Sequence, residues 1–142
     1  MTPARQPGNL AVSVRARLLN LSRLRHVELQ LLLSEFAVGR LLYRLGVSVH
    51  AEHFVLKGAM LFKLWPEACH RATWDLDLLG LGASSVADVA AAVGEICAIE
   101  VPDGIVFDGA SLVAEPIRAA NEHAGVRVRL GARLAEARIP VQ

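Results

Sequence analysis

The chain has 142 residues, of which 54% are hydrophobic and 20% charged, and these values are typical of a single globular domain. The two cysteines, Cys69 and Cys97, form no CxxC pair, so neither a disulfide framework nor a zinc knuckle is indicated. There is no secretory leader and no run of roughly 20 apolar residues, so we expect a cytoplasmic protein with no membrane partner.

Positive charge is concentrated near the start of the chain. Residues 1–50 contain seven arginines against two acidic residues, whereas residues 51–142 contain eight basic and twelve acidic residues, for a formal net charge of +1. This asymmetry can mark a nucleic-acid-facing element joined to a metal-binding one, but solvated helix faces are the commoner cause of the same pattern. Charge alone therefore leaves both interpretations open.

The first third of the chain predicts two helices. Residues 1–9 contain two prolines and a glycine, and we expect them to be disordered. From Val12 to Arg25, apolar residues at helical spacing alternate with arginines, which predicts an amphipathic basic helix. The segment from His26 to Gly46 is apolar around much of its circumference, so it should be buried on more than one side, with Gly46 as its C-terminal cap. Residues 12–46 are thus a helical lead-in.

Two short strands are predicted next. The apolar run from Phe54 to Leu56 ends at Lys57, Gly58 and Ala59, and residues 60–65 continue at helical spacing until Pro66, which indicates a strand, a tight turn and a helix. Residues 74–79 alternate polar and apolar side chains before two glycines, which predicts a second strand. Strands joined by one short helix should be neighbours in a sheet.

The remaining segment is rich in strand patterns. Ser84 is the expected N-cap of a helix that runs to about Ala98. Alternating apolar residues predict strands at 105–107, 112–117, 126–134 and from 138 to the end. We therefore expect an α+β fold in which a small mixed sheet with helices follows the helical lead-in, with residues 10–142 forming one domain.

Asp75 and Asp77 are the first candidates for chemistry. Side chains alternate faces along a strand, so both carboxylates should project from one side, with their Cα atoms about 7 Å apart. Mg²⁺ prefers carboxylate and phosphate oxygens, and ions held by such a pair can stabilise a phosphoryl or nucleotidyl transfer. Leu76, Leu78 and Leu79 would anchor the opposite face in the core. An Asp-x-Asp pair on its own is more often a turn or a solvated strand face.

Gly58 strengthens the case for a phosphate site beside these carboxylates. A glycine turn between a strand and a helix lets backbone N–H groups approach a phosphate, and the helix dipole favours negative charge there. Because the two strands should be neighbours, the turn and the carboxylate pair can face one pocket. Taken alone, Gly58 would be an ordinary strand-to-helix turn.

The runs FVLKGAMLFKLW and HRATWDLDLLG resemble the nucleotidyltransferase toxins of the AbiEii/AbiGii group, in the DNA polymerase β-like nucleotidyltransferase superfamily. The family pattern is a strand ending in Leu-Lys-Gly-Gly or a similar small pair, a helix, and then Arg-x-Thr-x-Asp-Leu-Asp. Its positions are occupied here by Leu56, Lys57, Gly58, Ala59, Arg71, Thr73, Asp75, Leu76 and Asp77. Later runs, including GIVFD and GVRVRL, extend the resemblance over most of the chain.

The resemblance implies a role for each motif residue. Asp75 and Asp77 would be catalytic and would bind Mg²⁺ or Mn²⁺, and Gly58 with Ala59 would hold the triphosphate of an NTP. Lys57, Arg71 and Thr73 would contact phosphate. The superfamily also uses a third carboxylate, which in this family follows the strand that begins here at residue 138. The sequence stops at Gln142, so the resemblance implies a chain truncated before that carboxylate.

The predicted function is transfer of a nucleoside monophosphate from an NTP to an acceptor, and toxin relatives imply that the acceptor is RNA, in particular tRNA, with a cognate antitoxin as partner. Alternatives are a non-catalytic remnant that binds nucleotide or nucleic acid, and a nucleotidyltransferase that modifies a small molecule or a protein.

His50 and His53 form an H-x-x-H pattern, for which a solvated loop is the better interpretation. Arg127, Arg129 and Arg133 share one strand face that could follow a polyanion or simply be solvated.

Overall fold

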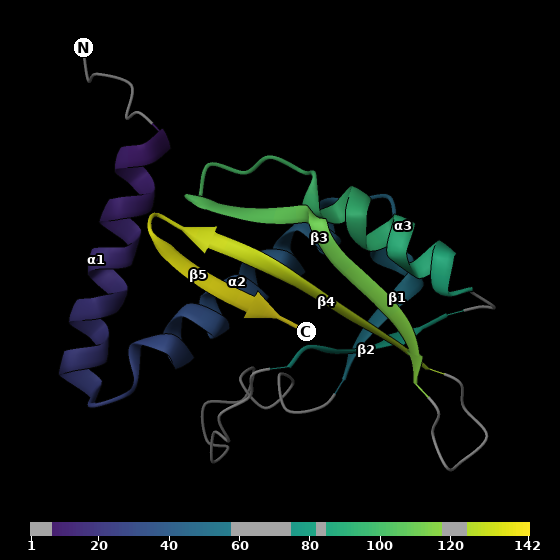
Figure 1. Ribbon diagram of the computed structural model, residues 1–142, viewed down its shortest axis with the longest axis horizontal. Coiled ribbons are helices and arrows are strands. Elements are labelled where there is room, and N and C mark those ends of the chain that lie inside the picture. Colours follow the sequence, from purple (N-terminus) through teal and green to yellow (C-terminus); the bar gives the residue numbers. More distant parts are fainter. Residues whose placement is uncertain (1–6, 58–74, 82–84, 118–124) are drawn as a thin grey trace.

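The computed structural model describes residues 7–57, 75–81, 85–117 and 125–142 (Figure 1). Three α-helices and five strands lie within these residues, and the α+β class is confirmed. In chain order the elements are α1 (Pro7–Arg25), α2 (Leu29–Val47), the 3₁₀ turn η1 (Ala51–His53), β1 (Phe54–Lys57), β2 (Asp77–Gly80), α3 (Val86–Cys97), β3 (Ile105–Ile117), β4 (Gly125–Leu134) and β5 (Ala137–Val141).

The strands form two small sheets. Strands β1 and β2 pair with each other, which confirms that they are neighbours, and β3, β4 and β5 form the second sheet in that order. All pairings between the described strands are antiparallel, rather than in the mixed arrangement that was expected. The backbone N–H of Leu76 donates to the carbonyl of Gln142 at 3.0 Å, so the segment leading into β2 lies against the end of β5, as Figure 1 also shows.

The helices are those expected, with corrected ends. Helix α1 begins at Pro7 rather than Val12, because a proline is tolerated in the first turn, where its missing N–H would have no partner. It ends where His26 adopts a positive φ of 54°, so α2 begins at Leu29 and not at His26. Gly46 is not a cap, because α2 continues to Val47 and the N–H of Ser48 closes the last turn on the carbonyl of Leu45.

Two further boundaries differ from the predictions. The N-cap of α3 is Ser85, whose hydroxyl accepts from the N–H of Asp88 while the Asp88 carboxylate accepts from the N–H of Ser85, a reciprocal capping box. The expected cap, Ser84, lies outside the described residues. The strands predicted at 105–107 and 112–117 are one strand, β3, interrupted by an irregularity between Asp108 and Val113. There the Ser111 hydroxyl accepts from the N–H of Gly131, which replaces a ladder partner.

The core lies between the helices and one face of the β3–β5 sheet. Helix α2 contacts α1, α3 and β5, which confirms burial on more than one side. Alternate residues of the sheet are buried against the helices, while the intervening residues face outward. Helix α1 approaches so closely that a Cβ on Gly104, whose φ is +85°, would lie 2.9 Å from the Cα of Ala11. The buried sheet residues are Ile105, Phe107, Leu130, Ala132, Leu134, Ile139 and Val141.

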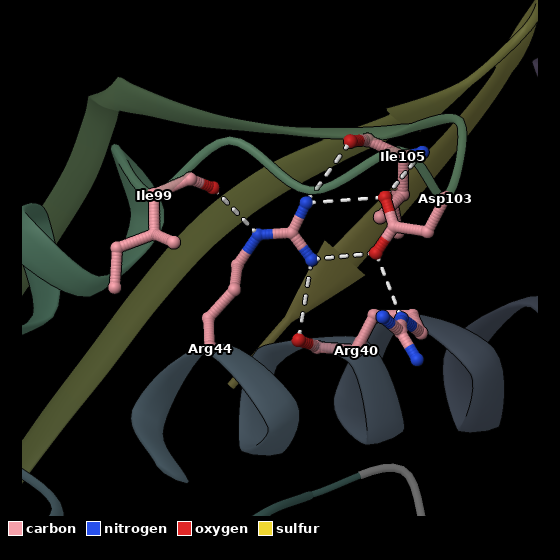
Figure 2. A network of polar contacts seen from close by, with 5 residues as sticks. All are labelled: Arg40, Arg44, Ile99, Asp103 and Ile105. Atoms are coloured by element: carbon pink, nitrogen blue, oxygen red, sulfur yellow. Dashed lines mark hydrogen bonds and ion pairs between the residues drawn. The ribbon is translucent and has the colours of Figure 1, made fainter. Parts of the chain in front are cut away.

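One charged cluster is buried within this core. Arg44 of α2 is 2% exposed, and its two terminal nitrogens donate to the two carboxylate oxygens of Asp103 at 2.7 and 3.1 Å (Figure 2). Arg40, one turn earlier, donates through Nε to the same carboxylate at 2.7 Å. The remaining Arg44 donors reach the carbonyls of Ile99, Arg40 and Ile105. The cluster therefore fixes α2 against the segment that joins α3 to β3.

The electrostatics of Asp103 follow from this geometry. Burial raises the pKa of its carboxyl group, but hydrogen bonds from Arg44 and Arg40 and the charge of Arg44 outweigh that effect, so the pKa lies below its ordinary value. The Arg44 guanidinium also lies over the Phe107 ring, 5.0 Å from its centroid. A fully bonded buried ion pair of this kind orients α2 beneath the sheet.

Candidate functional site

Asp75 and Asp77 lie on the outer side of the β2 segment. Both residues are exposed, whereas Leu76 and Leu78 pack against the hydrophobic core. The prediction that Leu79 also anchors in the core is wrong, because strand alternation places Leu79 on the same side as Asp77, where it is 50% exposed. The structure therefore has the alternation predicted from the sequence, although the strand begins at Asp77 and Asp75 precedes it. The leucines fix the rotation of the segment, and that rotation places both carboxylates on the solvent side.

Lys57 lies on the neighbouring strand at the same level. In the antiparallel register Lys57 is the partner of Asp77, and Leu56 is the partner of Leu78. Lys57 is exposed and Leu56 is half-buried, so β1 has the same alternation as β2. An ammonium and two carboxylates thus share the outer face of this two-stranded sheet.

The structure does not describe the other predicted site residues. Gly58, Ala59, Arg71 and Thr73 lie outside the described residues, as does the helix predicted at 60–65. Residue 58 directly follows the last residue of β1, and residue 73 is two positions before Asp75. Their assignment as triphosphate and phosphate contacts stays a prediction.

The end of β5 brings further polar groups to the same place. The carbonyl of Gln142 accepts from Leu76, the residue between the two aspartates, and the Gln142 side-chain Oε1 accepts from Nε of Arg129 at 3.2 Å. Arg129 also lies 3.5 Å from Oε1 of Glu115. Arg129 was identified in the sequence only as part of an arginine-bearing strand face. Its link to Leu76 through Gln142 depends on a contact between distant segments that local patterns do not encode.

The donors on this face suit a hard divalent cation. Asp75 and Asp77 offer carboxylate oxygens on a solvent-exposed strand, and Mg²⁺ takes one or two protein carboxylates together with water and substrate phosphates. Within the described part of the chain, no group of three or more His, Cys, Asp or Glu side chains could hold a metal. Asp75 and Asp77 would therefore supply two protein ligands, and water and substrate phosphates would complete the coordination.

Neither the histidine pair nor Cys97 provides an alternative centre. The Nε2 of His50 lies 2.6 Å from the Glu95 carboxylate of α3, and the His50 and His53 rings are 6.2 Å apart between centroids. Cys97 is buried, and burial raises the pKa of its thiol to about 11 even though the charge of Arg44 lowers it. Cys69 lies outside the described residues.

None of the described helices is both long and apolar enough to cross a membrane.

Comparison with known proteins identifies the family of the chain. The model of the family described as nucleotidyl transferase AbiEii toxin, Type IV TA system, matches residues 40–142. No curated protein and no solved structure matches the chain. The matched region begins within α2 and includes both sheets and the segment with Lys57, Asp75 and Asp77. The chain therefore belongs to the AbiEii nucleotidyl transferase toxin family.

Proposed function

We propose that this chain is a metal-dependent nucleotidyltransferase that takes a nucleoside monophosphate from an NTP and transfers it to an RNA acceptor, tRNA in particular. The observation that carries the proposal is the shared exposed face of Asp75 and Asp77, with Leu76 and Leu78 anchored in the core. Membership of a nucleotidyl transferase toxin family supports the reaction class. The identities of the metal, the NTP and the acceptor are all parts of the proposal.

Each residue of the face has a separate task in this proposal. Asp75 and Asp77 would hold a divalent cation, and a bound Mg²⁺ supplies charge stabilisation for the transferring phosphoryl group. Lys57, opposite Asp77, would attract the triphosphate electrostatically. Gly58 and Ala59 would cradle the triphosphate through backbone N–H groups, and Arg71 and Thr73 would contact its oxygens. The buried leucines keep both carboxylates on the solvent side.

The assignment of the aspartates is tested by nucleotide binding rather than by turnover. We expect Asp75→Asn or Asp77→Asn to abolish Mg²⁺-dependent NTP binding, measured by calorimetry, because each removes one charged ligand. Both residues are exposed, so the circular dichroism spectrum should not change. Glu136→Gln, at the exposed turn between β4 and β5, is the matched control and should bind NTP normally. Unchanged NTP affinity in both aspartate variants would exclude the site.

The acceptor is tested by following the transferred label. The protein is incubated with labelled NTPs and with either total tRNA or total protein, and the labelled fraction is identified. Label in tRNA supports the proposal, whereas label in protein or in a small molecule would assign a different acceptor. The family name also supports a cognate antitoxin as partner, and we expect a protein encoded beside this one to suppress the labelling.

A further inference from the structure

Four arginines lie on the outer face of the β3–β5 sheet, and they fall into two pairs. Arg127 and Arg129 flank Glu115, with nitrogen–oxygen distances of 3.9 and 3.5 Å. Arg133 and Arg138 are direct cross-strand partners on β4 and β5, and both are exposed. Within the described residues, neither forms an ion pair or a side-chain hydrogen bond. We call these two residues the arginine pair.

Two guanidinium groups directly opposite each other are unfavourable in the free protein. The Cβ atoms of cross-strand partners are about 5 Å apart, and like charges at that position repel. The arginine pair borders an open depression of about 540 Å³ beside Gly131, which has no side chain to fill it. Asp108 also borders the depression, with its Oδ1 accepting from the N–H of Ala110, so one negative charge stands against the two positive charges of the arginine pair. An anion bound here would replace repulsion with attraction.

We propose that the arginine pair binds the phosphodiester backbone of the RNA acceptor and directs it along β5 toward Asp75 and Asp77. Gln142 is four positions after Arg138, which is roughly 14 Å of strand. Gln142 in turn is bonded to Leu76, between the aspartates. The arginine pair and the carboxylate pair therefore lie at two ends of one strand. The RNA part of this inference rests on the proposed function.

The separation distinguishes a polynucleotide from smaller anions. One phosphate group cannot contact both the arginine pair and a metal held at the aspartates across this distance, whereas an acceptor strand with its reactive end at the aspartates carries further phosphates along β5. Guanidinium groups bind phosphate oxygens through two parallel N–H donors, so two of them suit one phosphodiester group and its neighbour. Arg129, beside Gln142 at the carboxylate end, already bonds Gln142 and Glu115, so its charge is partly satisfied.

The inference is tested by RNA binding in the absence of NTP and divalent ions. A fluorescein-labelled single-stranded RNA is titrated with the full chain, and its anisotropy is measured across a range of salt concentrations. We expect Arg133→Gln with Arg138→Gln to weaken binding by about tenfold and to reduce the slope of log affinity against log salt by about 1 to 2. Lysine at both positions should restore most of the affinity, because charge is retained.

The matched control neutralises two exposed arginines elsewhere. Arg23→Gln with Arg25→Gln, in the last turn of α1, makes the same change in net charge and should leave RNA affinity almost unchanged. Greater loss in this control than in the sheet variant would place the RNA on α1 and overturn the inference. So would displacement of the RNA by polyglutamate at equal charge concentration, which would indicate an acidic protein segment as the occupant.

Failure of this inference differs from failure of the proposed function. If the proposed function fails, Asp75→Asn and Asp77→Asn bind NTP normally, and the RNA titration is unaffected because it contains no NTP. If the inference fails, RNA affinity is the same with and without the arginine pair, while the NTP measurements are unchanged. Thermal unfolding of the glutamine variants should match that of the parent protein, since both side chains are exposed.

Discussion

Asp103 and Glu115 each lie between two arginines, but in surroundings that differ in almost every respect. The side chain of Asp103 is 9% exposed, and Arg40 and Arg44 reach it at 2.7 Å. The side chain of Glu115 is 46% exposed, and Arg127 and Arg129 approach only to 3.9 and 3.5 Å. The two sites have the same charges. They differ in exposure to solvent and in the number of hydrogen bonds.

This difference separates a group that holds the fold from one that is available to ligands. Arg44 satisfies its remaining donors with backbone carbonyls, so breaking the Asp103 cluster would leave a buried guanidinium without its counter-charge. Around Glu115, water can replace either arginine at small cost. The outer sheet face is therefore a surface on which charges can exchange partners, whereas the cluster beneath the sheet is fixed.

The largest expected effect follows from removing the buried carboxylate charge. We expect Asp103→Asn to lower the free energy of unfolding by about 3–5 kcal/mol, because Arg44 stays buried without a counter-ion. Glu115→Gln is the matched control, and it should cost less than about 1 kcal/mol. Urea unfolding followed by circular dichroism measures both. Similar small losses in the two variants would show that the Asp103 cluster does not hold α2 against the sheet.

Acid should act on the same cluster. The pKa of Asp103 in the folded protein lies below its ordinary value of about 3.9, so folding favours the charged form. The stabilising contribution is therefore complete above the unfolded pKa and is lost as pH falls through the lower folded pKa. The parent protein should lose more stability than Asp103→Asn between about pH 5 and pH 2. Parallel pH profiles for the two proteins would contradict this assignment.

A smaller effect is expected where α1 meets the same loop. Gly104→Ala should cost about 1–3 kcal/mol, because its φ of +85° disfavours a side chain and the added Cβ would lie 2.9 Å from the Cα of Ala11. Gly46→Ala, inside α2 with open space around it, should instead stabilise by up to about 1 kcal/mol. Thermal unfolding of both variants gives the signs. A loss of stability in Gly46→Ala would contradict the open space around Gly46 inside α2.

The contrast between buried and exposed charge was only partly readable from the sequence. Alternation along residues 74–79 correctly placed Asp75 and Asp77 outward, because the period of a strand is a local property. Arg44 carried a signal that was overlooked: it lies between Leu41 and Leu45 on the apolar stripe of α2. A charged residue in that position requires a buried partner.

The partners themselves could not be derived from local patterns. Asp103 is 59 residues from Arg44 in the chain, and Gln142 meets Leu76 through a backbone hydrogen bond that no motif marks. The bulge that joins two expected strands into β3 depends on Ser111 reaching Gly131 across the sheet. In each case the local sequence pattern predicted the correct type of element. A contact between distant segments then determined where the element ends or which element lies beside it.

The smallest effect should come from the arginine pair itself, and its sign is the informative part. Arg138→Glu places a carboxylate directly opposite Arg133, replacing a repulsive cross-strand pair with an attractive one, so unfolding should require about 0.2–1 kcal/mol more free energy. The same variant should bind RNA less tightly than Arg138→Gln, because it adds negative charge to the proposed path. Urea unfolding at low salt resolves the stability change, and the gain should shrink as salt screens the new pair. A net loss of stability would mean that the Arg138 side chain supports the fold. The charges of the outer sheet face would then be fixed, like those of the buried Asp103 cluster, and would not be free to exchange partners.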